Sequence, residues 1–297
     1  MMYENWAVTL TFFAGLSALV SFVLHLGLRK EGLKRLGQAA MGLALLGSAT
    51  ILVLRGVIAQ HAPWSNLWES MITMLFASLV FYFVVEIWYK PRFFGVAAAP
   101  LVMVLIGGAS ILPASFKGAA PLMPALQSYW IKIHVLLILF SYAAFTMSFA
   151  AALAYFFFAW KSRRAERLVL AGAGGVDGNM AGGDSAGLMP FKEQLSFFDE
   201  LTYRLILMGF PLLMIGIITG AMWANGAWGT YWSWDPKETW SLITWFVYAA
   251  YLHARLTHDW TGDRAAGLAV CGFASMVVTY IGVNYLSSGL HSYGFIR

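Results

Sequence analysis

Charged side chains are scarce in this sequence. Only 11% of its 297 residues are Asp, Glu, Lys or Arg, whereas soluble domains carry about 25%. Hydrophobic residues make up 60% of the chain, and its mean hydropathy is +0.69. This composition excludes a water-soluble globular enzyme and also intrinsic disorder, which needs low hydrophobicity. The sequence therefore predicts an all-α integral membrane protein, because a membrane-spanning helix takes about 20 apolar residues.

Cysteine is almost absent. Cys271, inside an apolar run, is the one cysteine of the chain. A single cysteine excludes an internal disulfide, a CxxC redox pair, a zinc cluster and a CxxCH motif. We expect Cys271 to be a small buried hydrophobic side chain. No nucleophile and no acid–base pair stands out along the chain, so no catalytic residue is predicted.

Apolar segments long enough to be transmembrane helices dominate the chain. We expect eight of them, at residues 5–28, 37–58, 67–89, 93–112, 129–160, 204–224, 237–256 and 265–286. With an external N-terminus, fourteen of the nineteen Lys and Arg residues fall on the internal side, as the positive-inside rule requires. Both termini are then external to a bacterial cytoplasmic membrane. The net charge of +5 is accounted for by internal loops and does not predict nucleic-acid binding.

The chain is expected to form a single polytopic membrane domain over residues 1–297. Residues 161–196 are predicted to be an internal loop, because glycine and alanine dominate the centre of this segment and favour a flexible linker. Residues 225–240 are predicted to be an external segment between the sixth and seventh spans.

The most unusual stretch of the chain is residues 223–245, which holds six of its thirteen tryptophans. An interfacial aromatic belt is one interpretation, since tryptophan favours the headgroup level of a membrane. A belt needs only one or two aromatic residues at each span end, however, whereas here they cluster at one end of one span. We therefore predict an aromatic platform on the external face, built by Trp228, Trp232, Trp234, Asp235 and Trp240.

A helix-start signal lies within this aromatic stretch. Asp235 suits an N-cap, Pro236 suits the first helical position, and Glu238 completes a capping box. The seventh span should therefore begin at Pro236, and a loop or short surface helix should precede it. Aromatic faces suit a large, flat, apolar ligand, and a helix N-terminus suits anionic groups on its edge. A porphyrin with two propionates has both properties.

Residues 228–245 (WGTYWSWDPKETWSLITW) resemble the tryptophan-rich WWD signature of the haem-handling proteins of cytochrome c biogenesis. The layout, with eight spans and the signature between the sixth and seventh, is similar to the CcsA/ResC branch of System II, which some naming schemes call CcsB. The earlier stretch Pro63–Ser70 (PWSNLWES) also resembles a feature of this family. Asn66 and Glu69 within it fit equally well a capping box that starts the third span.

The resemblance implies that His134 and His291, the external histidines that flank the signature, are axial ligands of haem iron. Haem iron does take axial imidazoles, and His134 follows Trp130 by four residues, so the two share one helix face. An interface anchor is the alternative for either histidine alone.

The resemblance also implies that His253, inside the seventh span, ligates haem on its way outward. An ionisable residue within a span is a functional candidate by default, although His253 could instead snorkel to the inner interface beside Arg255. His25 lies at a similar depth in the first span and is a less favoured candidate for a second ligand. The roles of His25 and His61 are left open.

The leading hypothesis is a membrane subunit of the cytochrome c maturation machinery that binds non-covalent haem b. It would receive or export haem and present it externally for attachment to the CxxCH cysteines of apocytochrome c. Whether it is an enzyme by itself or a component of a holocytochrome c synthase (haem lyase) complex is left open. The resemblance implies a ResB/CcsB-type membrane protein, apocytochrome c and a thiol-reducing protein as partners.

Two other functions compete with this hypothesis. The first is a System I-type relative that handles haem with a different partner. The second is a polytopic transporter or respiratory subunit, in which buried carboxylates are expected near the middle of the membrane. None of the eight predicted spans has an Asp or Glu near its middle, which disfavours this second alternative.

Overall fold

The computed structural model describes residues 2–118, 122–173 and 184–283. Within these ranges the chain is helical and contains no strand. Two short 3₁₀ turns, η1 (Ala114–Phe116) and η2 (Pro124–Leu126), precede the fifth helix, and a π-helical turn, η3 (Val278–Gly282), continues the eighth. The α-helices are α1 (Met2–Leu28), α2 (Glu31–Ala59), α3 (Leu67–Tyr89), α4 (Phe94–Ile111), α5 (Tyr129–Ala173), α6 (Asp184–Trp228), α7 (Pro236–Thr257) and α8 (Asp263–Val277).

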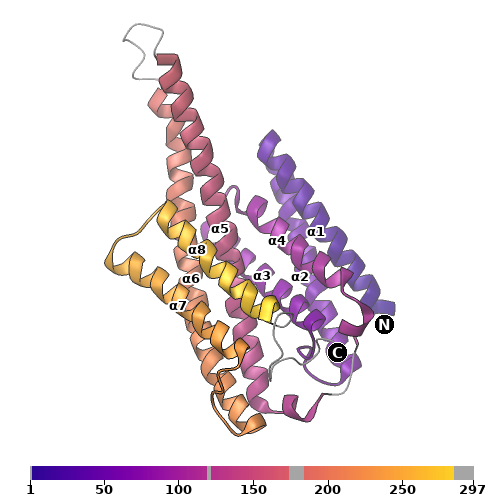
Figure 1. Ribbon diagram of the computed structural model, residues 1–297. Coiled ribbons are helices and arrows are strands. Elements are labelled where there is room, and N and C mark those ends of the chain that lie inside the picture. Colours follow the sequence, from indigo (N-terminus) through magenta and orange to yellow (C-terminus); the bar gives the residue numbers. More distant parts are fainter. Residues whose placement is uncertain (1, 119–121, 174–183, 284–297) are drawn as a thin grey trace.

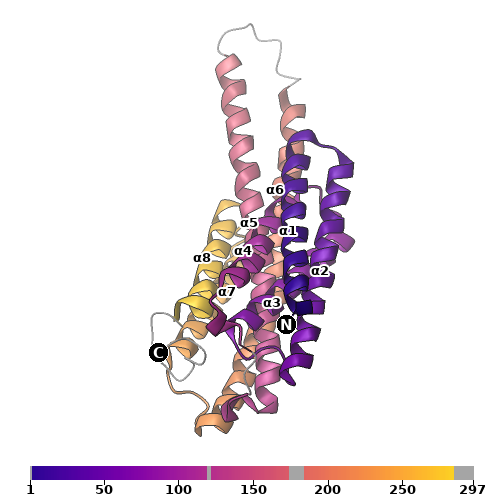
Figure 2. The ribbon, with the colours of Figure 1, turned by 90° about the vertical axis from the view of Figure 1, so that its right-hand side faces the viewer.

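The long antiparallel helices α5 and α6 form the centre of the molecule. Figures 1 and 2 show the α1–α2 pair on one side of this hairpin and the α7–α8 pair on the other. Both views also show α5 and α6 projecting well beyond the remaining helices at one end. The functional features described below lie at the opposite end, where α3 and α7 begin.

The predicted fold class, an all-α integral membrane protein, is confirmed. Seven of the described helices are long and apolar enough to cross a membrane, by length and composition. The predicted seventh span, α7, is 22 residues long but is not among these seven, because its Trp, Tyr, Thr and charged residues lower its hydropathy. It nevertheless packs against α8 and runs antiparallel to it (Figure 1).

The predicted loop 161–196 is largely helical, and this expectation is corrected. α5 continues to Ala173 and α6 begins at Asp184. Residues 161–168 (KSRRAERL) are straight-chain residues and alanine with one serine, and such residues have high helix propensity. They therefore extend the helix beyond the apolar segment that ends at residue 160. The glycine-rich centre, residues 174–183, lies outside the described residues.

Cys271 also differs from expectation, because its side chain is exposed on α8 and not buried. The outer surface of a membrane bundle faces lipid, so an apolar side chain needs no protein cover there. Exposure of Cys271 is thus compatible with its apolar surroundings in the sequence.

A buried ion network ties together the first three helices near the start of α3. The Arg55 guanidinium lies 3.1 Å from a Glu4 carboxylate oxygen and 2.9 Å from a Glu69 oxygen. All three side chains are less than a tenth exposed. Arg55 also donates to the Lys117 carbonyl and stacks over the Trp68 ring at 4.8 Å. The network therefore joins α1, α2, α3 and the loop that follows α4.

Arg55→Ala should lower the free energy of unfolding by about 3–5 kcal/mol, because it leaves two carboxylates buried without a counter-charge. Denaturation of the protein in detergent micelles measures this loss. The matched control is Arg204→Ala, which removes an exposed pair with Glu200 and should cost at most about 1 kcal/mol. Equal losses in the two variants would contradict a stabilising role specific to the buried network.

Candidate functional site

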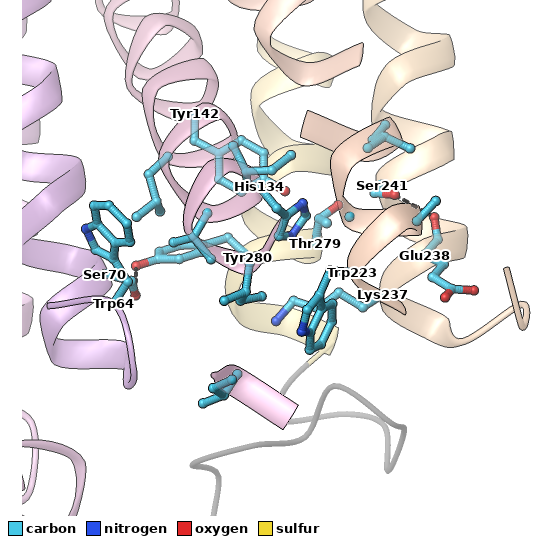
Figure 3. Close-up of a pocket in the computed structure, with 18 of the residues that line it drawn as sticks. Trp64, Ser70, His134, Tyr142, Trp223, Lys237, Glu238, Ser241, Thr279 and Tyr280 are labelled. Atoms are coloured by element: carbon cyan, nitrogen blue, oxygen red, sulfur yellow. Dashed lines mark hydrogen bonds between the residues drawn. The ribbon is translucent and has the colours of Figure 1, made fainter. Parts of the chain in front are cut away.

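A cavity of about 230 Å³ lies at the end of the bundle where α3 and α7 begin. Its walls come from α3, α5, α6, α7, the loop before α3 and the π-helical turn η3. Figure 3 shows His134 near the centre of this cavity, with Trp64 and Ser70 on one side and Glu238 and Ser241 on the other. The cavity therefore joins segments that are far apart in the sequence.

His134 projects from α5 toward α6. Its Nδ1 lies 2.7 Å from the Gly216 carbonyl oxygen. A carbonyl only accepts hydrogen bonds, so Nδ1 carries the proton, and in the neutral ring Nε2 carries the lone pair. The imidazole also stacks on the Trp223 ring, at 6.4 Å between centroids and 13° between planes. Both contacts fix the orientation of the ring.

Glycines of α6 make room for these contacts. A Cβ atom at Gly220 would lie 2.6 Å from His134 Nδ1, and one at Gly216 would lie 2.7 Å from the Ile138 side chain. About two helical turns earlier on α6, a Cβ at Gly209 would meet the Phe145 ring. Small residues on one face let two membrane helices approach closely. Here the close approach also brings the Gly216 carbonyl within reach of the imidazole.

Aromatic side chains form much of the cavity wall. Trp223 is buried and its indole nitrogen donates to the Ala125 carbonyl at 2.8 Å. Trp64 and Trp232 line the cavity from two other segments. Tyr280, on η3, lines it too, and its hydroxyl lies 2.8 Å from Ser70 Oγ (Figure 3). A π-helical turn is frequent at functional positions of a helix.

The predicted start of α7 is confirmed. Asp235 is the N-cap, its carboxylate accepts from the Lys237 amide at 2.9 Å, and Pro236 is the first helical residue. Glu238 Oε2 accepts from the Asp235 amide at 3.2 Å and from the Ser233 amide at 2.8 Å. The cap thus holds the preceding loop against the helix and places Lys237 and Glu238 on the cavity wall.

The start of α3 uses a related arrangement. Asn66 is the N-cap and accepts from the Glu69 amide at 2.9 Å, as the predicted capping box requires. The Glu69 carboxylate, however, accepts from the Ser65 amide at 2.7 Å and also from the Ser65 hydroxyl at 2.8 Å. The loop carrying Trp64 is therefore fixed by a carboxylate that belongs to the buried Arg55 network.

The predicted platform is only partly assembled around the cavity. Trp232 lines it, whereas Trp228, Trp234 and Trp240 do not. Trp228 is the last residue of α6 and packs edge-on against Trp223 at 4.7 Å. A loop or a short surface helix was expected before α7, and the structure has a loop there, which carries Trp232.

Trp234 points to the outside of the molecule. Its φ is +59°, in the left-handed region, and its side chain is 69% exposed. Its ring touches Trp232 edge-on at 5.8 Å. Trp240 is half-buried, and its carbonyl accepts from Thr244 and Thr279. Trp234 thus contacts Trp232, and Trp240 connects the first turns of α7 with η3.

Three other histidines, His25, His61 and His253, do not line the cavity. His253 is exposed on α7, 17 positions after Pro236 or about 25 Å along a helix, and its ring lies 5.5 Å from that of His258. His25 is fully buried, and its Nδ1 lies 3.0 Å from the Lys30 carbonyl oxygen. His61 is half-buried in the loop before α3, and His291 lies outside the described residues.

Several lining residues were not predicted from the sequence, namely Trp223, Lys237, Tyr142 and the pair Thr279–Tyr280. A signal for the α5–α6 contact does exist, because Gly216 and Gly220 form a GxxxG pattern in an apolar helix. Trp223 lies three residues after this pattern. The position of Tyr280 on the cavity wall depends on tertiary packing of η3 against α3, and no local sequence pattern predicts it.

Two comparisons with known proteins show one family. Residues 64–291 match the cytochrome C assembly protein family. The chain is 40% identical over 296 residues to the cytochrome c biogenesis protein CcsA of Gloeobacter violaceus, with 89% of this chain and 88% of the relative covered. It is 38% identical over 299 residues to the protein of the same name from Guillardia theta, with 99% and 97% covered.

A solved structure supports the fold. The chain superposes on the cytochrome c haem lyase CcmF with a TM-score of 0.68 and 16% sequence identity. The superposition covers 97% of this chain and 47% of that protein, so the chain spans about half the length of this structural relative.

Asp235→Ala should lower the free energy of unfolding by about 0.5–2 kcal/mol, because the first turn of α7 loses its N-cap. Intrinsic tryptophan fluorescence should also change, since the loop carrying Trp232 and Trp234 is held by this cap. Thermal denaturation and fluorescence spectra measure the two effects. Asp235→Asn keeps a cap acceptor and should retain most of the stability; equal loss in both variants would mean that the carboxylate charge, not capping, matters.

Proposed function

This chain belongs to the cytochrome c assembly protein family, and we propose that it receives haem b, holds it non-covalently and presents it on the external face for attachment to apocytochrome c. Haem is the cargo of this reaction, and the cysteines that receive it belong to the CxxCH motif of the apocytochrome. The single observation that carries the proposal is the state of His134 inside the cavity.

His134 has the arrangement typical of a metal-ligating histidine. Such a histidine almost always donates its second ring N–H to a carboxylate or backbone carbonyl, which fixes the tautomer and raises the basicity of the ligating nitrogen. In this chain the Gly216 carbonyl accepts that bond at 2.7 Å. The neutral ring then offers Nε2 to haem iron, which takes axial imidazoles. The donor present in the cavity therefore fits haem.

The remaining walls also suit a flat apolar macrocycle with anionic edges. Trp64, Trp223 and Trp232 supply aromatic surface from three segments, and aromatic rings pack well in offset or edge-on contact with other π systems. Lys237 places a cationic side chain on the wall beside the N-terminus of α7. A cation and a helix N-terminus both favour carboxylates, so this corner suits the propionates.

We propose His291 as the second axial ligand, on the strength of the sequence resemblance alone. We also keep His253 as a proposed ligand for haem before it reaches the cavity, since His253 lies at the opposite end of α7. Trp228, Trp234 and Asp235 support the cavity by holding Trp223, Trp232 and the start of α7 in place.

The chain contributes position and not covalent chemistry. When bound, haem supplies two vinyl groups, and addition of a thiol across each forms a C–S bond while the thiol hydrogen passes to the neighbouring carbon. His134, the aromatic walls and the α7 cap hold the macrocycle at the outer end of the bundle. Holding two reactants in a fixed relation accounts for large rate gains without any protein nucleophile.

We propose that the cavity and both termini lie on the external side of a bacterial cytoplasmic membrane. The distribution of Lys and Arg supports this orientation. Apocytochrome c, a thiol-reducing protein and a ResB/CcsB-type membrane protein are the proposed partners, and the chain would act as a component of a holocytochrome c synthase. The relatives at 38–42% identity are named CcsA, which favours System II over a System I-type role.

His134→Gly should remove most of the haem that copurifies with the protein, because the iron loses an axial nitrogen. Added imidazole should restore part of it, since a small neutral ligand supplies the same nitrogen. The absorption spectrum of the purified protein measures both changes. His61→Gly is the matched control, because His61 does not line the cavity, and it should retain haem; full haem content in His134→Gly would refute the assignment.

Gly220→Ala should weaken haem binding by about 10–100-fold, the usual effect of disturbing the partner of a ligating histidine. The new Cβ would lie 2.6 Å from His134 Nδ1 and would displace the imidazole from the Gly216 carbonyl. Haem titration followed by absorption gives the affinity. Gly226→Ala, on the same helix, meets open space and should bind haem normally. Equal affinity in both variants would show that the Gly216 contact is irrelevant.

A further inference from the structure

One face of α7 carries polar side chains along its whole length. Ser241, Thr244, Tyr248, Tyr251 and Arg255 follow one another at spacings of three and four residues, so they lie on a single face of the helix. Thr244, Tyr248 and Tyr251 are buried to within 1% of full burial. This stripe faces the bundle and not the lipid, and it explains why α7 is the least apolar of the long helices.

The middle of the stripe and the adjacent Trp245 hold polar atoms that no described protein group satisfies. The Tyr248 and Tyr251 hydroxyls and the Trp245 indole N–H are buried and have no hydrogen-bond partner among the described residues. Tyr248 stacks on Phe145 of α5 at 3.7 Å, and Trp245 stacks on Phe210 of α6 at 5.4 Å. Leaving a buried polar group unpaired costs about 1–3 kcal/mol, so three such groups within two turns call for a ligand.

Satisfied polar groups bound the stripe at both ends. On the cavity side, the Thr244 and Thr279 hydroxyls lie 2.9 Å apart, and Thr279 and Ser241 line the cavity. At the other end, Arg255 forms an ion pair with Asp199 at 2.6 Å, with both side chains about a tenth exposed. The unsatisfied groups therefore lie between the cavity and a nearly buried ion pair.

We propose that this face of α7 binds a short chain of ordered water molecules that connects the outer cavity with the Arg255–Asp199 pair. A buried water needs two to four polar partners, and Trp245, Tyr248 and Tyr251 provide them within two turns of the helix. Buried polar groups inside a membrane protein are expensive and typically line a path for water, ions or protons. This hydrated seam is independent of haem binding and goes beyond the function proposed above.

Radiolytic footprinting of the intact protein in lipid nanodiscs tests the seam, because radicals formed from bound water oxidise the side chains beside it. Tyr248 and Tyr251 should be modified several-fold faster than Tyr82. Tyr82 is the matched control, since it is a fully buried tyrosine whose hydroxyl donates to Glu86. Modification of Tyr248 and Tyr251 at the rate of Tyr82 would overturn the proposal.

The double variant Tyr248→Phe/Tyr251→Phe gives a second readout. If the hydroxyls are dry and unpaired, removing them should raise the thermal midpoint, because an unfavourable buried group is lost. If water satisfies them, the midpoint should stay the same or fall, as it should for Tyr82→Phe. A clear rise in the midpoint of the double variant would therefore also overturn the hydrated seam.

Discussion

The close approach of α5 and α6 is the constraint on which the site depends. Lipid gives membrane helices no hydrophobic reason to associate, so packing of small residues has to hold them together. Gly209, Gly216 and Gly220 provide that packing, and each would clash with an α5 side chain if it carried a Cβ. The same glycines put a backbone carbonyl within 2.7 Å of His134. Helix association and the choice of histidine tautomer therefore have one structural cause.

The cavity is completed by two helix starts of similar design. Residues 64–69 and 232–238 each begin with a tryptophan and a serine, and each also contains an N-cap residue and a glutamate that accepts from the serine amide. In both, the first tryptophan lines the cavity. The glutamate thus closes a local loop whose rigidity fixes an aromatic wall. At α3, the glutamate of this loop, Glu69, also pairs with the buried Arg55 guanidinium. Arg55 therefore helps to fix the loop that places Trp64 on the cavity wall.

Local chemistry was predictable from the sequence, whereas convergence of distant segments was not. The start of α7 at Pro236 follows from Asp235 and Glu238 alone, because caps act within one turn. Trp234 does not line the cavity. Its side chain is exposed and its φ lies in the left-handed region, which the residue type does not predict. The position of Trp223 on the cavity wall was not predicted, because it depends on packing against His134 of α5. The loop predicted at 161–196 is largely helical. The prediction gave more weight to the glycines at its centre than to the residues of high helix propensity on either side.

The low hydropathy of α7 follows from two requirements, one at each end of the helix. Its first turn must present Lys237 and Glu238 to a polar-edged cavity, and its last turn ends at an ion pair with α6. A helix that is apolar on all sides could neither line the polar edge of the cavity nor form the ion pair with α6. Aromatic residues reconcile the demands, because Tyr and Trp bury large apolar rings while keeping one polar atom each. Tyr248 stacks on Phe145 through its ring and still carries a hydroxyl into the bundle. The tryptophan and tyrosine content of this segment therefore serves the interior of the bundle as well as the cavity.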